Sequence, residues 1–148
     1  MKVKECMCNN VYSCTPETTV YDVAKLMQTN HVGCIPICDE QKNMVGLVTD
    51  RDLVLRCIAS NKDVKQTPVS DIMTTEICAC TPDDDMTNAQ SKMGSNQIRR
   101  LPVIDNGTIV GMLTLGDIAK NDIELGQEEV SDTINSICED QIENKNAE

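Results

Sequence analysis

The chain carries one sequence pattern twice, and this internal repeat limits the folds that it can adopt. In order along the chain, the matching segments are Val3–Met7 with Val69–Met73, Cys14–Pro16 with Cys80–Pro82, Ile35–Ile37 with Leu101–Val103, and Met44–Thr49 with Ile109–Thr114. The offset is 66 residues in the first three matches and 65 in the last, as Cys14 and Cys80, then Thr49 and Thr114, illustrate. Because order and spacing are kept, we predict two copies at 3–56 and 69–122. A connector at 57–68 separates them, and an acidic helix or tail at 123–148 follows.

Each copy has the residue pattern of a small mixed α/β unit. Val20, Val23 and Met27 recur at helical spacing, and two apolar runs of strand length follow at Cys34–Cys38 and Met44–Val48. A second helix is expected around 51–59 in the first copy and 116–124 in the second. We therefore predict the order strand, helix, strand, strand, helix (βαββα) in each copy, as a tandem α+β repeat packed with pseudo-twofold symmetry.

The helix near the start of the second copy is expected to be the weaker of the two. Its apolar positions Met86, Ala89 and Met93 are interrupted by Gln90 and followed by Gly94, which disfavours a helix. In the same copy the two strands are joined through Asn106-Gly107, and Asn-Gly favours the positive φ angles of a tight hairpin turn.

Composition and charge narrow the classes of function. The formal net charge of −11 disfavours nucleic acid as a partner, because such binding needs a basic face. Nine cysteines without an apolar leader at the start favour free thiols and a cytoplasmic location, and no apolar run is long enough to suggest membrane attachment. A single histidine, His31, and the lack of a glycine-rich phosphate loop leave little material for catalysis. We expect no enzyme and no required cofactor.

Two motifs resemble those of cystathionine-β-synthase-type (CBS) domains, and the resemblance extends over residues 3–122. They are Ile98-Arg-Arg-Leu-Pro-Val-Ile-Asp105 and Gly-x-x-Thr-x-x-Asp, which occurs at Gly46–Asp52 and again at Gly111–Asp117. The resemblance implies a bacterial-type, stand-alone pair of CBS domains, known as a Bateman module. Such a pair senses an adenine nucleotide or adenosyl ligand, of the AMP, ADP, ATP or S-adenosylmethionine type, in a cleft between the copies. It also implies a homodimer and an effector protein on another chain.

The same resemblance assigns the ligand-binding residues. One cleft is expected to contain Thr49, Asp50, Arg51 and Asp52, completed from the second copy by Cys78, Thr81, Arg99 and Arg100. The other is expected to pair Thr114 and Asp117 with Thr15, Gly33 and Cys34. Guanidinium groups suit phosphate, so the first cleft is expected to prefer a phosphorylated ligand. Accordingly, Asp52→Ala or Arg100→Ala is expected to weaken adenylate binding more than Asp117→Ala.

Structural alternatives remain open for these residues. A threonine followed three residues later by an acid is also a capping box, which explains both Thr-x-x-Asp sequences without a ligand. The arginine pair can serve as a solvated or ion-paired surface.

Other functions also remain open. Cys6, Cys8, Cys78 and Cys80 allow a thiol- or metal-sensing module, although they lack the paired Cys-x-x-Cys of structural zinc sites. A ligand-free dimerisation scaffold is a further alternative. In the tail, Val130, Ile134, Ile137 and Cys138 lie at helical spacing and predict a helix that packs on its own module or on a partner.

Overall fold

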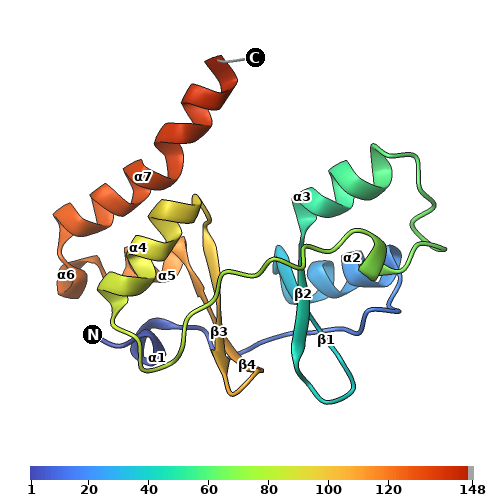
Figure 1. Cartoon of the computed structure of the whole chain (residues 1–148), viewed down its shortest axis with the longest axis horizontal. Helices are drawn as coiled ribbons and strands as arrows, with labels where there is room; N and C mark the ends of the chain where they lie inside the picture. The colour runs from blue at the N-terminus through green and yellow to red at the C-terminus, as the bar shows by residue number, and fades with distance from the viewer. Residues whose placement is uncertain (147–148) are drawn as a thin grey trace. The chain divides into compact units, whose positions relative to one another are not determined.

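The computed structural model of the protein describes the backbone of residues 1–146 and the side-chain surroundings of residues 1–138. The chain forms two compact units (Figure 1). The first unit contains Val11–Ile77 and Asn106–Ile109, and the second contains Met1–Asn10, Cys78–Asp105 and the chain from Val110 onward. No helix in the described part of the chain is both long and apolar enough to cross a membrane.

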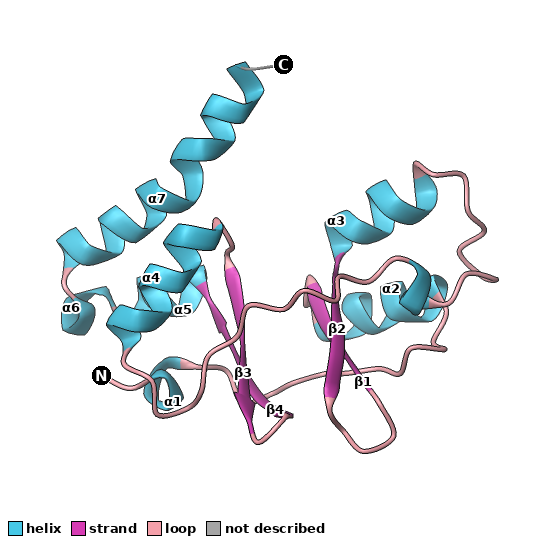
Figure 2. Cartoon of the chain, in the orientation of Figure 1, coloured by secondary structure: helices cyan, strands magenta, loops and turns pink. Residues whose placement is uncertain are grey.

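The first unit is a two-stranded antiparallel sheet with helices packed on it (Figure 2). Strands β1 (Cys34–Cys38) and β2 (Met44–Thr49) pair so that Cys34 lies opposite Thr49. Helix α2 (Val20–Asn30) precedes them, and α3 (Asp50–Asp52) continues after them as the π-helix η1 (Leu53–Ile58). A 3₁₀ turn, η2 (Val69–Asp71), closes the unit. The core consists of Val20, Val23, Met27, Ile35, Ile37, Val48, Leu53, Cys57, Val69 and Ile72.

The second unit repeats this arrangement and extends it with further helices. It contains α1 (Val3–Cys6), α4 (Met86–Asn96), β3 (Arg100–Asp105), β4 (Thr108–Thr114) from Val110 onward, α5 (Leu115–Lys120), α6 (Asp122–Leu125) and α7 (Gln127–Asn146). Strands β3 and β4 pair with each other. Between them, Asn106 and Gly107 have φ of 51° and 84°, which confirms the tight turn expected from Asn-Gly.

The predicted fold class, a tandem repeat of mixed helix and strand, is confirmed. The strand expected at the start of each copy is reduced to a single parallel bridge, Cys14 with Ile37 in the first unit and Cys80 with Val103 in the second. Proline occupies the next position but one in each case, and proline cannot donate to a sheet, so the pairing stops there.

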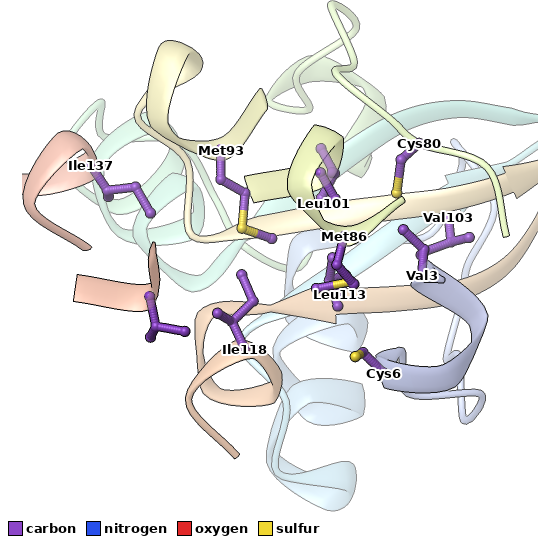
Figure 3. Close-up of a cluster of buried hydrophobic side chains, with 12 residues drawn as sticks. Val3, Cys6, Cys80, Met86, Met93, Leu101, Val103, Leu113, Ile118 and Ile137 are labelled. Carbon is purple, nitrogen blue, oxygen red and sulfur yellow. The ribbon is translucent and has the colours of Figure 1, made fainter. Parts of the chain in front are cut away.

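The first residues of each copy, Val3–Met7 and Val69–Met73, are called its lead-in segment. Each lead-in segment packs in the unit that is formed mainly by the other copy. Val3 and Cys6, from the start of the first copy, are buried in the core of the second unit among side chains of β3 and β4 (Figure 3). Conversely, Val69 and Ile72, from the start of the second copy, complete the core of the first unit. The compact units therefore do not follow the repeat boundaries read along the sequence.

Polar contacts hold each exchanged segment in place. Lys2 and Lys4 form ion pairs of 2.7 Å and 2.8 Å with Asp85 and Asp83 of the second unit. Cys8 forms a β-bridge with Met112 in the second unit, and the equivalent bridge in the first unit joins Thr74 to Leu47. The exchange is thus the same in both directions at the level of the backbone.

Helix α7 explains the polar residue on α4. The Gln90 side chain is buried and donates a 3.3 Å hydrogen bond to Thr133 Oγ1 of α7, while Val130 and Ile137 are buried beside them. A Cβ atom on Gly94 would lie 3.1 Å from Ser136 Cβ, so glycine allows the two helices to approach closely. The tail therefore packs on its own unit; residues 147–148 of the predicted tail lie outside the described residues.

Candidate functional site

Each unit has one strand-end site, where the second strand of its sheet passes into a helix. In the first, Thr49 Oγ1 accepts a 3.3 Å hydrogen bond from the Asp52 N–H, and Asp52 Oδ2 accepts one of 2.9 Å from the Thr49 N–H. In the second, the matching distances for Thr114 and Asp117 are 3.1 Å and 2.9 Å. Both sites are complete capping boxes, so the structural role considered for these residues is present in each.

Capping leaves polar groups available at these sites. Each carboxylate uses one oxygen for the cap, whereas an ionised carboxylate can accept several hydrogen bonds. Asp52 and Asp117 are both half-buried, so they remain reachable from solvent. A cap residue can therefore also contact a ligand hydroxyl at the same site.

The turn before the first strand of each sheet lies directly beside its strand-end site. Gly33 O accepts a 3.0 Å bond from the Asp50 N–H, and Arg99 O accepts the equivalent 2.9 Å bond from the Leu115 N–H. Where the first site has Gly33 and Cys34, the second has Arg99 and Arg100. The structure thus brings the arginine pair next to Thr114 in the backbone of its own unit.

This neighbourhood offers a second possible assignment for the arginine pair. The resemblance to CBS domains predicts that Arg99 and Arg100 lie opposite Thr49 and Asp52, on the other copy. That pairing concerns the relative placement of the two units and stays a prediction, whereas the backbone bond to Leu115 links the pair to the Asp117 site.

The remaining predicted site residues lie on loops before the helices. Thr81 donates from its N–H and its hydroxyl to Asp84, both at 2.9 Å, and these bonds lower the pKa of the Asp84 carboxyl. Thr15 contacts the Thr18 hydroxyl at 3.2 Å. Both threonines are exposed, and their hydroxyl groups already take part in local turns.

Arg56 was missed by the sequence reasoning. Its Nε lies 3.6 Å from Asp52 Oδ1, four residues earlier, and its Nη1 donates to Ile72 O and to Thr74 Oγ1. The spacing of an acid followed four residues later by a base was a usable signal for the ion pair. By contrast, Asp117 has no ion pair with the residues whose side chains the structure describes.

The cysteines do not form a metal site in the described part of the chain. No group of three or more His, Cys, Asp or Glu side chains there is arranged to hold a metal ion. Of the four candidates, Cys6 and Cys80 are buried, Cys78 is half-buried and accepts a bond from Asn96, and Cys8 is exposed. Burial raises the pKa of Cys80 to about 11, which keeps it a protonated thiol at neutral pH.

A groove of 350 Å³ lies between α4 and α7, away from the predicted site residues. It is lined by Thr87, Gln90, Ser91, Gly94, Ser95, Glu129, Asp132, Thr133 and Ser136. We place the candidate site at the strand ends, because the groove follows from the contact of two helices with small side chains.

Comparison with known proteins agrees with the repeat and the strand-end motifs. The family model "CBS domain" matches this chain twice, at residues 3–58 and 69–124. The chain belongs to the CBS-domain family, as a tandem pair. It is similar to the CBS domain-containing protein YhcV of Bacillus subtilis, with 41% identity over 119 residues, covering 80% of this chain and 84% of that protein.

Solved structures share the fold. Hypoxic Response Protein I, solved with two coordinated zinc ions, has a TM-score of 0.75 and 26% identity, and the match covers 81% of this chain and 98% of that one. The CBS domain pair of protein MJ0100, solved with 5′-methylthioadenosine and S-adenosyl-L-methionine, has a TM-score of 0.74 and 24% identity over 81% of this chain and 94% of that one. The second likeness shows the fold alone.

Proposed function

We propose that the chain is a regulatory module that binds an adenine nucleotide or an adenosyl ligand at its strand-end sites. The observation that supports this most is the second site, where Asp117, without an ion pair in the described residues, lies at a helix start whose first residue, Leu115, donates a backbone hydrogen bond to Arg99 O. A carboxylate accepts the two hydroxyl groups of a ribose, and guanidinium groups bind phosphate. An adenylate offers both groups.

The proposal extends to how the module acts. The ligand transmits a signal by binding two conformations of the module with different affinity. The protein acts in the cytoplasm as a homodimer that an effector protein on another chain recognises, and it performs no catalysis. The acidic net charge of −11 supports a small ligand over a nucleic acid.

A ligand panel tests the proposal directly. Thermal unfolding is measured with AMP, ADP, ATP, S-adenosylmethionine and zinc. A ligand at about 100 times its Kd adds roughly 2.7 kcal/mol of stability, which raises the Tm by several degrees at this chain length. If only zinc or an oxidant shifts the Tm, the thiol or metal alternative replaces this one, and if nothing shifts it, the scaffold alternative does.

Matched variants then locate the ligand. Asparagine at 117 or at 52 keeps an oxygen for the capping bond but removes the charge, so the fold is retained. Asp117→Asn is expected to weaken AMP binding about ten- to a hundredfold, the loss expected for charged hydrogen bonds, and Asp52→Asn to weaken it less. The opposite order in isothermal titration would restore the pairing of the arginines with Asp52 that the sequence suggested.

Adenosine provides the control for the arginine pair. Arg99→Gln is expected to weaken AMP binding and to leave adenosine binding within about twofold, because only AMP carries the phosphate. Equal losses for both ligands would show that the arginine does not contact the phosphate.

A further inference from the structure

Arg56 connects two parts of the first unit that are distant in sequence. Its Nε lies 3.6 Å from Asp52 Oδ1. Its Nη1 donates to Ile72 O at 3.2 Å and to Thr74 Oγ1 at 3.3 Å. A planar guanidinium offers donors on separate edges, so a single side chain can hold a carboxylate and a backbone segment together.

The segment that Arg56 holds is the exit from the first unit. Ile72 is 2% exposed, and Thr74 exchanges two backbone hydrogen bonds with Leu47, of 2.8 Å and 2.9 Å. Three residues further on, the chain leaves the first unit at Ile77 and enters the second at Cys78. Thr74 is therefore the last anchored residue that we consider before the chain enters the second unit.

Among the residues whose side chains the structure describes, the second unit does not repeat this connection. Asn121 stands at the position equivalent to Arg56, and its Nδ2 donates to Asp117 O of its own helix at 2.7 Å. An asparagine has neither the charge nor the length to join the carboxylate to the exchanged segment. The two strand-end sites therefore have the same capping box, but only Asp52 of the first site is paired with a cation that also holds an exchanged segment.

We propose that Arg56 is a positioning residue that couples the Asp52 carboxylate to the exit segment Ile72–Thr74. The inference rests on the proposed function, because Asp52 is the group that a ribose hydroxyl would engage. One carboxylate oxygen of Asp52 is used by the cap and the other faces Arg56. A ligand that takes both oxygens competes with Arg56, weakens its hold on the carboxylate and loosens the exit segment.

The first test needs no ligand. Amide hydrogen exchange at Thr74 and Leu47 is measured in the full-length protein, in Arg56→Gln, in Asp52→Asn and in the double variant. Local opening sets the exchange rate of such amides. Arg56→Gln is expected to speed exchange at Thr74 about three- to tenfold, and Asp52→Asn about twofold, given the modest energies of partly exposed charged contacts.

Coupling is read from the double variant. If Arg56 acts through Asp52, the double variant exchanges no faster than Arg56→Gln alone, because the two losses are not additive. Lys62→Gln removes the same charge from the same unit and is the control, with exchange at Thr74 unchanged. The proposal would be overturned if the two substitutions multiplied their effects on the exchange rate at Thr74 in the double variant. An exchange rate at Thr74 that is unchanged in Arg56→Gln would also overturn it.

The second test uses adenosine, whose lack of phosphate avoids a direct contact with the guanidinium. In the unsubstituted protein, saturating adenosine is expected to speed exchange at Thr74 about two- to fivefold. In Arg56→Gln the rate is already high and does not respond, while adenosine binds about threefold more tightly at the Asp52 site because the competing cation is gone.

The two proposals fail in different ways. If neither adenosine nor AMP binds the unsubstituted protein, the proposed function fails and the ligand-free comparison still decides the role of Arg56. If adenosine binds and exchange at Thr74 responds equally in the unsubstituted protein and in Arg56→Gln, the coupling by Arg56 is refuted and the binding function stands.

Discussion

Replacing Gly111 by alanine tests the exchange of lead-in segments at its tightest contact. Gly111 is a buried residue of β4, and a Cβ atom there would collide with Sδ of Met7, lie 3.0 Å from its Cγ and lie 3.2 Å from the backbone O of Cys8. Gly46 is the equivalent residue of the first unit, where the Cβ would collide with Met73 Sδ. The atoms nearest to it all belong to the Met73 side chain.

This difference sets the magnitudes. A thioether side chain is flexible and can move aside, but the Cys8 carbonyl is held by its bridge to Met112. Overpacking a core costs about 1–3 kcal/mol, and the gain from a less flexible unfolded chain offsets about 0.4–1 kcal/mol. We expect Gly111→Ala to destabilise the protein by about 2 kcal/mol and Gly46→Ala by about 1 kcal/mol or less.

Urea unfolding followed by far-ultraviolet circular dichroism measures these values, since the chain has no tryptophan. Gly116→Ala is the control, because Gly116 is an exposed helical residue and the nearest atom to its Cβ, Thr114 Oγ1, lies at 3.5 Å. This variant is expected to be neutral or slightly stabilising. Adding Met7→Ala to Gly111→Ala should restore part of the loss. A Gly111→Ala protein as stable as the parent would show that Met7 does not pack on β4.

Two further predictions concern the cores. Burial raises the pKa of Cys80 from 9.0 to about 11, so the stability that this thiol contributes is complete below pH 9 and is lost between pH 9 and about 11, because the unfolded thiol ionises more than the folded one in that range. Cys80→Ala should remove this loss of about 2–3 kcal/mol from alkaline unfolding curves. Because Val69 and Ile72 belong to the core of the first unit, fragment 11–77 should show more cooperative unfolding than fragment 1–61, and equal behaviour in circular dichroism would contradict the exchange.

The sequence was sufficient wherever a structure depends on near neighbours. The Asn106-Gly107 turn and the Thr114–Asp117 cap each follow from residues within four positions of one another, and both are present. The first helix after the hairpin was expected at 51–59 and lies at Asp50–Ile58 as α3 and η1. Short-range hydrogen bonding and side-chain period determine these features, so spacing reveals them.

Contacts between distant segments were not predictable in the same way. Nothing in the spacing of Val3 and Cys6 indicates that they pack with the second copy, because a repeat looks the same whether its lead-in stays or exchanges. From the sequence, Gln90 interrupts the apolar face of a helix. In the structure its side chain donates a hydrogen bond to Thr133 of α7, a partner that local spacing does not indicate. Arg56 was overlooked because two of its three contacts, Ile72 and Thr74, are 16 and 18 residues away.

The repeat has kept its interior and changed its sites, and this division bears on function. Ile35 and Leu101 are equivalent and both fully buried, as are Val48 and Leu113. At the strand ends, by contrast, the residues differ between the copies. Arg99 and Arg100 occupy the positions equivalent to Gly33 and Cys34, and Asn121 occupies the position equivalent to Arg56. A duplicated scaffold needs equivalent cores. Two identical binding sites, however, would respond over the same range of ligand concentration. On the proposed function, a ribose at Asp52 competes with Arg56, whereas Asp117 has no ion pair in the described residues. We therefore expect ligand to fill the Asp117 site before the Asp52 site.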